Sequence, residues 1–273
     1  MTDANSQKRI EKPIFVFGCN NSGTTILGKA LQSHKEIDCP PDEGPLRPGW
    51  PKEMTHFLCS HTFRIWAHPI WRKGNETLPG DNLAYYMSEE DVSDSLSRKI
   101  TDFYGSYNQR ICDHSPQFTL RARALQEIFP DAYFVAIVRN GYAVAEGTRR
   151  KREFDPDRPH MSGFPTTIED AATHWCNANR IIESYQRLGL LKRVTIITYE
   201  NLVQKTDETL QGVLGFCGLN PQGFSIPQFE KGLNDTQISR LDQSEIAAIT
   251  RIANPMLAHF KYPIPKEGYQ GVY

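Results

Sequence analysis

The chain has 273 residues, of which 39% are hydrophobic and 23% are charged, and this balance is typical of a globular protein with one sizeable core. Its formal net charge of -1 provides no overall attraction to nucleic acid or to an anionic membrane, so we expect neither partner. No apolar run approaches the roughly 20 residues of a membrane-spanning helix, and residues 1–12 lack a hydrophobic signal core. We therefore expect one cytoplasmic domain over residues 1–273, while the oligomeric state is left open.

Predicted strands and helices alternate along the chain. Short apolar or β-branched runs predict strands at residues 13–17, 37–39, 110–113, 132–138 and 194–199, and helical spacing predicts helices at residues 26–33, 88–105, 119–129, 142–152, 166–188, 206–216 and 244–260. Ser88 and the acidic residues after it are expected to cap the second of these helices. The alternation predicts an α/β fold in three layers, with a central, mostly parallel sheet flanked by helices.

Residues of about 45–87 interrupt this alternation. Prolines break the chain at its start, and the segment that follows is irregular and rich in aromatic side chains. We interpret it as an insert in the sheet domain. Its flat rings either stack on an acceptor molecule or form a satellite core of their own.

The six cysteines are scattered without C-x-x-C spacing. This spacing is the sequence pattern of zinc knuckles and redox motifs, and dense disulfide frameworks belong to small secreted domains. We therefore expect reduced, mostly buried thiols and no bound metal ion.

The segment from Gly18 to Thr25 reads Gly-Cys-Asn-Asn-Ser-Gly-Thr-Thr and joins the first predicted strand to the first predicted helix. A turn of small residues at a helix start directs main-chain N–H groups at one point, where the helix dipole favours an anion. The segment therefore predicts a phosphate-binding loop. The loop of nucleoside triphosphatases, G-x-x-x-x-G-K-[ST], has lysine where this chain has Thr24, so an ATP or GTP hydrolase and a P-loop kinase are disfavoured.

The Ser-Gly-Thr-Thr ending of this loop resembles the 5′-phosphosulfate loop of sulfotransferases, which bind 3′-phosphoadenosine 5′-phosphosulfate (PAPS). Three further parts of the chain are similar to the same family: Asp113-His114-Ser115-Pro116 with the run 129–140, Tyr199-Glu200-Asn201-Leu202-Val203 with 214–219, and Pro255-Met256-Leu257 with Tyr262. The last of these resembles the tyrosylprotein sulfotransferases and their bacterial relatives. The resemblance implies a transferase with the P-loop NTPase-like sulfotransferase fold.

The resemblance also implies which residues hold the donor. Main-chain N–H groups of the loop and its side-chain hydroxyls would contact the 5′-phosphosulfate. Arg139 would hold the 3′-phosphate, and Ser239 aligns with a serine near the nucleotide. Tyr199 either lines the adenine pocket or packs as an ordinary core tyrosine at a strand end. The loop residues concerned are Asn20, Asn21, Ser22, Gly23, Thr24 and Thr25.

Asn21 departs from the family pattern. Family members usually carry lysine or arginine at this position, where the cation neutralises charge on the bridging oxygen as the sulfuryl group leaves. Asn21 brings a hydrogen-bond donor without charge, and a charge-assisted hydrogen bond is about twice as strong as a neutral one. We therefore expect weaker transition-state stabilisation unless Arg149 or Lys29 supplies the cation. Asn21 could instead serve as a turn residue that tolerates an unusual backbone conformation.

Two further departures concern the 3′-phosphate. The family usually has a phosphate-binding serine eight residues after the arginine, and this chain has Gly147 there. Arg139 would then act alone or with the basic run 149–152, which is otherwise a solvated helix end. The tail Lys266-Glu267-Gly268 only weakly resembles the Arg-Lys-Gly phosphate clamp of the cytosolic enzymes.

The resemblance nominates two general bases. His114, two residues before Pro116, matches the catalytic histidine of the cytosolic enzymes, and an imidazole suits proton abstraction near neutral pH. In the tyrosylprotein branch the base is a glutamate after the second strand, which falls by register on Asp42, with Glu43 adjacent. We favour His114 over Asp42.

The sequence thus predicts a PAPS-dependent sulfotransferase that moves a sulfuryl group to a hydroxyl or amine of a carbohydrate or other small acceptor and releases adenosine 3′,5′-bisphosphate. The alternative is a nucleotide-binding protein of the same fold that has lost turnover, since Asn21 and Gly147 both depart from the family pattern.

Overall fold

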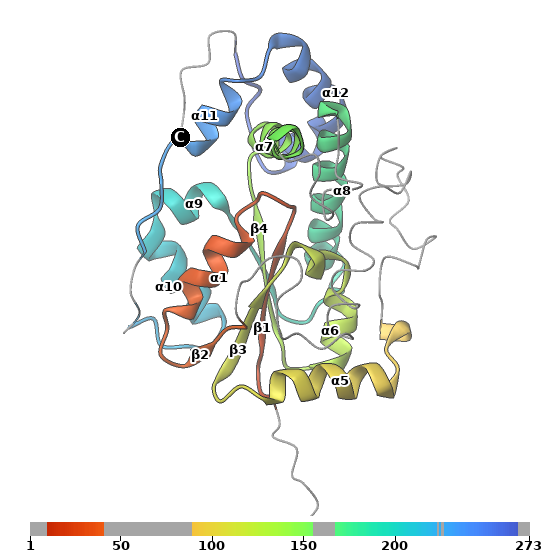
Figure 1. Cartoon of the computed structure of the whole chain (residues 1–273), viewed down its shortest axis with the longest axis vertical. Coiled ribbons are helices and arrows are strands. Elements are labelled where there is room, and N and C mark those ends of the chain that lie inside the picture. The colour runs from red at the N-terminus through yellow and green to blue at the C-terminus, as the bar shows by residue number, and fades with distance from the viewer. Residues whose placement is uncertain (1–9, 41–88, 155–166, 223, 225–226, 267–273) are drawn as a thin grey trace, which may run out of the picture.

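The computed structural model describes residues 10–40, 89–154, 167–222, 224 and 227–266 (Figure 1). Its five-stranded sheet has the order β2-β3-β1-β4-β5, and every adjacent pair is parallel. The strands are β1 (Ile14–Gly18), β2 (Ile37–Asp38), β3 (Arg110–His114), β4 (Tyr133–Val138) and β5 (Val194–Thr198). The predicted parallel α/β sheet is therefore confirmed.

Helices pack against both faces of this sheet. The α-helices are α1 (Thr24–Gln32), α5 (Asp94–Gly105), α6 (Ala122–Ile128), α7 (Gly141–Phe154), α8 (Ile168–Arg187), α9 (Tyr199–Gln204), α10 (Thr206–Phe216), α11 (Leu233–Ile238) and α12 (Gln243–His259), with 3-10 turns η3 (Glu89–Asp91) and η4 (Pro116–Leu120). Figure 1 shows α1, α9 and α10 on one side of the sheet and α5, α6 and α8 on the other. The three predicted layers are confirmed.

Alternating side chains of the central strands divide the core into two halves. Phe15 and Phe17 of β1 belong to the larger half, which includes buried residues of α5, α6 and α8. Ile14 and Val16 point the other way, into a smaller half formed with α1 and α10. Both halves are buried because a parallel sheet is covered on both faces.

The carboxyl ends of four strands bring the predicted site residues to one edge of the sheet. Strand β1 runs into the loop before α1, β3 ends at His114, β4 is followed by Arg139, and β5 is followed by Tyr199. Helices α7 and α11 lie beyond this edge (Figure 1). In open α/β sheets ligands bind at the carboxyl edge of the strands, so the fold itself indicates where the site lies.

Three local predictions were wrong. The second predicted helix begins at Asp94 rather than Ser88, because Ser93 caps it by accepting a hydrogen bond from Leu96 N, while residues 89–91 form only a 3-10 turn. The predicted helix 119–129 is split into η4 and α6. Tyr199 does not end a strand; Thr198 accepts a hydrogen bond from Asn201 N and starts α9 there.

The prediction of one domain with an aromatic insert stays a prediction, since residues 41–88 lie outside the described part of the chain. Cys19, Cys112, Cys176 and Cys217 are buried free thiols. Burial raises the pKa of Cys217 to about 12, which keeps this thiol protonated. No helix within the described segments is both long and apolar enough to cross a bilayer.

Candidate functional site

The loop between β1 and α1 is a tight turn that needs small residues. A Cβ on Gly18 would lie 2.4 Å from the carbonyl oxygen of Ile137 in β4, so only glycine fits there. Gly23 has φ 103°, and a Cβ on it would lie 2.9 Å from the ring of Tyr199. Asn21 has φ 65°, a conformation that asparagine tolerates better than most residues. This backbone conformation is the one expected of Asn21 as a turn residue, and its role toward the donor stays a prediction.

The first turn of α1 offers its main-chain N–H groups to a ligand. Gly23 at the N-cap has no side chain to accept from them, and the first turn contains no acidic residue. Ser22 is fully buried beside it, and its hydroxyl has no hydrogen-bond partner among the described residues. Thr24 is buried and Thr25 is exposed. These unsatisfied donors suit an anion at the helix N-terminus.

Arg139 is a buried cation that lies over the loop. Its side chain is only 4% exposed, and its guanidinium donates to Asn234 Oδ1 at 2.8 Å, to the carbonyl oxygen of Asn21 at 2.9 Å and to Gln237 Oε1. All three acceptors are neutral. Burial lowers the pKa of Arg139, and none of the described carboxylates forms an ion pair with it. A buried charge is normally paired, so this geometry favours a bound anion.

Glu200 holds these groups in place without touching the guanidinium. Its Oε1 accepts hydrogen bonds from Asn140 N at 3.0 Å and Asn234 Nδ2 at 2.6 Å, and its Oε2 accepts from the Tyr262 hydroxyl at 2.9 Å. Asn234 therefore bridges the buried carboxylate to Arg139. The chain of contacts fixes the orientation of the guanidinium at the end of β4.

Tyr199 lies between the loop and Arg139. The guanidinium carbon of Arg139 is 4.2 Å from the centroid of the tyrosine ring, which is a cation–π contact. Burial raises the pKa of Tyr199, although the nearby Arg139 charge acts in the opposite direction. The ring thus supports both the loop and the arginine. Its prediction as an adenine-pocket residue stays a prediction.

His114, at the end of β3, packs against α1. Its side chain is 3% exposed, and a Cβ on Gly28 would lie 1.8 Å from the imidazole Cδ2, so the ring occupies the space that a larger residue at 28 would need. The main-chain N–H of His114 donates to the buried Asp113 side chain. The structure thus places the favoured base one helical turn beyond the start of α1, on the same strand edge as the loop.

Asn21 directs its side chain toward α7. Its Nδ2 donates to Thr148 Oγ1 at 2.8 Å, so the amide ties the loop to that helix. Of the two cations considered as substitutes for the missing charge, Arg149 forms an ion pair with Glu245 at 2.8 Å and Lys29 is exposed on α1. Their role as substitutes stays a prediction.

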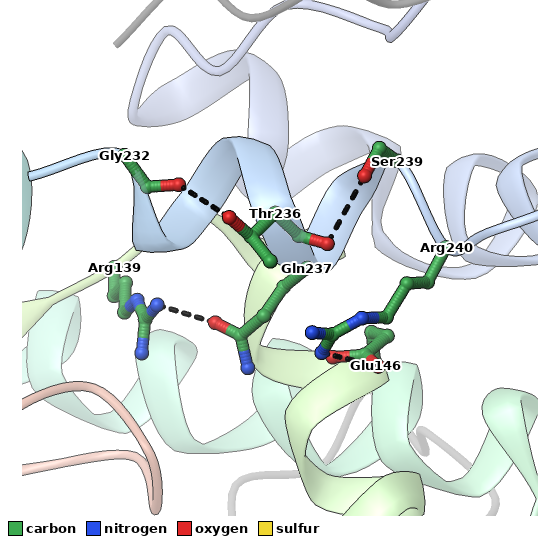
Figure 2. Close-up of polar contacts among 7 residues, drawn as sticks. All are labelled: Arg139, Glu146, Gly232, Thr236, Gln237, Ser239 and Arg240. Carbon is green, nitrogen blue, oxygen red and sulfur yellow. Dashed lines mark hydrogen bonds and ion pairs between the residues drawn. The ribbon is translucent and has the colours of Figure 1, made fainter.

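Other predicted site residues lie apart from this cluster or outside the described chain. Asp42 and Glu43 fall in residues 41–88, which are not described. Ser239 is exposed at the end of α11 and donates to the carbonyl oxygen of Thr236 in its own helix (Figure 2). Gln237, two residues earlier, is the side chain that contacts Arg139. Lys266 is exposed, and the rest of the weak tail motif is not described.

Sequence reasoning missed the residues that hold Arg139. Glu200 was noted only as part of a motif, and Asn234 and Gln237 were not predicted at all. Both lie on α11, a helix of six residues that was not predicted. Its one signal was Gly232, which has φ 80° and precedes the helix.

Comparison with known proteins indicates the family of this chain. The family model described as "Sulfotransferase family" matches residues 13–222 of the chain. The chain belongs to the sulfotransferase family. The matched range contains the loop, His114, Arg139 and Tyr199, and ends before α11.

The curated relatives share little sequence identity with this chain. Nodulation protein NoeE from Sinorhizobium fredii is 23% identical over 247 residues, covering 83% of this chain and 54% of the relative. Protein-tyrosine sulfotransferase 2 from Gallus gallus is 23% identical over 212 residues, covering 76% of this chain and 51% of the relative. The chain thus spans about half the length of these two relatives.

Solved sulfotransferase domains share the fold. The sulfotransferase domain of the Synechococcus PCC 7002 olefin synthase has a TM-score of 0.55 at 19% identity, covering 96% of this chain and all of that domain. The sulfotransferase domain from the curacin biosynthetic pathway has a TM-score of 0.51 at 15% identity, with 94% of this chain covered and all of that domain. At these identities the likeness concerns the fold, and it confirms the predicted fold class.

Proposed function

We propose that this protein is a PAPS-dependent sulfotransferase that transfers a sulfuryl group to a hydroxyl or amine of a carbohydrate or other small acceptor. Membership of the sulfotransferase family supports the transferase class. The observation that carries the choice of donor is the pairing of an uncapped helix N-terminus with a buried, unpaired arginine above it. A nucleotide with a 5′-phosphosulfate and a 3′-phosphate presents two anionic groups, and the site offers one receptor for each.

The residues of this chain fit that donor. When bound, PAPS supplies an activated sulfuryl group on its 5′-phosphate. The N–H groups of the loop and the first turn of α1 bind the 5′-phosphosulfate, with the buried hydroxyl of Ser22 as a further donor. Arg139 binds the 3′-phosphate. In this proposal His114 takes the proton from the attacking acceptor atom, so that a new bond to sulfur forms as the bond to the phosphate oxygen breaks.

The relatives include proteins named for tyrosine sulfation and a nodulation protein, so protein tyrosine belongs in any test beside glycans. No group of three or more side chains suited to a metal ion occurs in the described part of the chain, and the proposed chemistry asks for none.

Calorimetry and a transfer assay together test the proposal. Purified protein should bind adenosine 3′,5′-bisphosphate (PAP) and should move radiolabelled sulfate from sulfur-35 PAPS to at least one member of a panel of glycans, phenols and a tyrosine peptide. Mg²⁺-ATP serves as the control ligand and should not compete. Failure to bind PAP, or tighter binding of Mg²⁺-ATP, would remove the donor assignment.

A second candidate is a nucleotide-binding protein of this fold without turnover. The observation that favours it is the position of Asn21, whose amide donates to Thr148 and brings no charge to the loop. PAP binding without transfer, even after Asn21→Lys is introduced, would support this candidate. Transfer by the wild-type protein would eliminate it.

A further inference from the structure

Three consecutive residues of α7 contact the two segments that hold Arg139. Glu146 forms an ion pair with Arg240 at 3.4 Å, Gly147 lies under Gln237, and Thr148 accepts a hydrogen bond from Asn21. A Cβ on Gly147 would lie only 2.3 Å from Gln237 Nε2. The amide of Gln237 therefore occupies the space that any side chain at position 147 would need.

The orientation of this amide is fixed. Gln237 Oε1 accepts a hydrogen bond from Arg139 Nη2, so Nε2 must lie on the other side of the carboxamide, above Gly147. Figure 2 shows the amide nitrogen of Gln237 and a terminal nitrogen of Arg139 pointing to the same side, away from α11. Gln237 is 9% exposed, and Nε2 has no hydrogen-bond acceptor among the described residues. Both N–H groups of Gln237 Nε2 are therefore available to a ligand, next to the guanidinium of Arg139.

The side chains of Arg139 and Gln237 together form a site that suits an anion. Arg139 supplies the charge, and Gln237 supplies a directed donor whose partner oxygen is already held by the same arginine. A carboxamide suits this position, because one end accepts from the cation while the other end donates to its ligand. A hydrogen bond to a charged group contributes more than one between neutral groups.

We propose that Gln237 is a specificity-determining residue that donates from Nε2 to the 3′-phosphate of the donor nucleotide, in place of a side chain at position 147. This inference rests on the proposed function. It explains how the site tolerates glycine at 147, since α11 rather than α7 delivers the second donor. Because the free hydrogens of Gln237 face only the 3′-phosphate, the residue should distinguish PAP from adenosine 5′-monophosphate (AMP), which lacks that group.

Calorimetric titration of PAP, AMP and inorganic phosphate separates the outcomes. In Gln237→Ala the affinity for PAP should fall by about tenfold or more, as expected for a lost hydrogen bond to a charged group. The affinity for AMP should not change. Thr236→Ala is the matched control, because this side chain lies on the same short helix, is exposed and donates only to the carbonyl of Gly232.

The competition between Gln237 and a side chain at position 147 for the same space gives a second test by PAP affinity. Gly147→Ser should weaken PAP binding in the wild-type background, where it collides with Gln237. In the Gln237→Ala background the space is empty, so the same substitution should restore part of the lost affinity. The isosteric Gln237→Glu keeps the acceptor for Arg139 and replaces the donor by a second oxygen, so it should weaken PAP binding strongly even if the alanine variant fails to fold.

Equal losses of PAP and AMP affinity in Gln237→Ala would overturn the inference, as would unchanged PAP binding or failure of the double variant to recover. Wild-type protein that binds inorganic phosphate as tightly as PAP would show a general anion site and would also overturn it. If the wild-type protein binds neither nucleotide, the proposed function fails instead, so the two failures are distinct.

Discussion

The role of His114 as base can be tested through its neighbour Gly28, without changing the imidazole. A Cβ on Gly28 would lie 1.8 Å from His114 Cδ2, whereas ordinary contact begins at 3.4 Å. The ring in Gly28→Ala must therefore move by the difference, about 1.6 Å. A displacement of about 1 Å in a reacting group can cost about 100-fold in rate, and a general base contributes roughly 100-fold to 10,000-fold.

We therefore expect Gly28→Ala to lower the kcat of sulfate transfer by about 100-fold or more, with little change in the affinity for PAP. Alanine is favoured over glycine inside a helix by about 1 kcal/mol, while overpacking costs about 1–3 kcal/mol. The free energy of unfolding should thus fall only modestly. Sulfur-35 transfer, PAP calorimetry and urea unfolding measure the three quantities.

Gly215→Ala in α10 is the matched control, because a Cβ there meets no atom within 4 Å. It should leave transfer unchanged. If Gly28→Ala transfers sulfate at the wild-type rate while it binds PAP normally, the position of His114 is irrelevant to the reaction and the reasoning is wrong. In that case Asp42 becomes the base to test.

Three other perturbations test the surroundings of the loop. Gly23→Ala combines a backbone of φ 103° with a Cβ 2.9 Å from the Tyr199 ring, so PAP titration should show weaker binding and unfolding should show a loss of about 1–2 kcal/mol. Glu200→Gln replaces an acceptor by a donor toward Tyr262 or Asn234. We expect the free energy of unfolding to fall by about 1–3 kcal/mol and the affinity for PAP to fall more than the affinity for AMP. If Glu200 has only a structural role, the ratio of the PAP and AMP affinities should not change. Burial lowers the pKa of His174 well below 6.5, so the unfolded chain binds a proton that the folded chain resists. The free energy of unfolding should therefore be highest above about pH 6.5 and should fall by at most about 1.4 kcal/mol per pH unit below it. In urea unfolding, His174→Gln should make the free energy of unfolding less dependent on pH.

The sequence predicted those parts of the fold whose signal is local. The loop, Arg139 and His114 follow strands with long apolar patterns, and the carboxyl ends of parallel strands meet at one edge. Helix starts were less certain, because Ser88 and Ser93 are both acceptable N-cap residues and only the structure shows that Ser93 caps α5.

The residues around Arg139 could not be predicted in the same way. Successive helical residues are separated by about 100°, so Ser239 and Gln237 lie about 200° apart and face nearly opposite sides. A helix of six residues has too few turns to show which side is buried, so the sequence did not indicate that Gln237 contacts Arg139. The role of Ser239 near the nucleotide stays a prediction. Asn234 and Glu200 are 34 residues apart in the sequence, and their hydrogen bond forms only when the chain is folded.

The arrangement of Glu200, Asn234 and Arg139 explains why the arginine stays available to a ligand. A carboxylate in direct contact with Arg139 would neutralise it and compete with an incoming phosphate. Asn234 separates the two by one side chain: its amide donates to Glu200 while its oxygen accepts from Arg139. The buried guanidinium is therefore oriented but not neutralised. A preorganised, unpaired cation of this kind is what selective binding of an anionic donor requires.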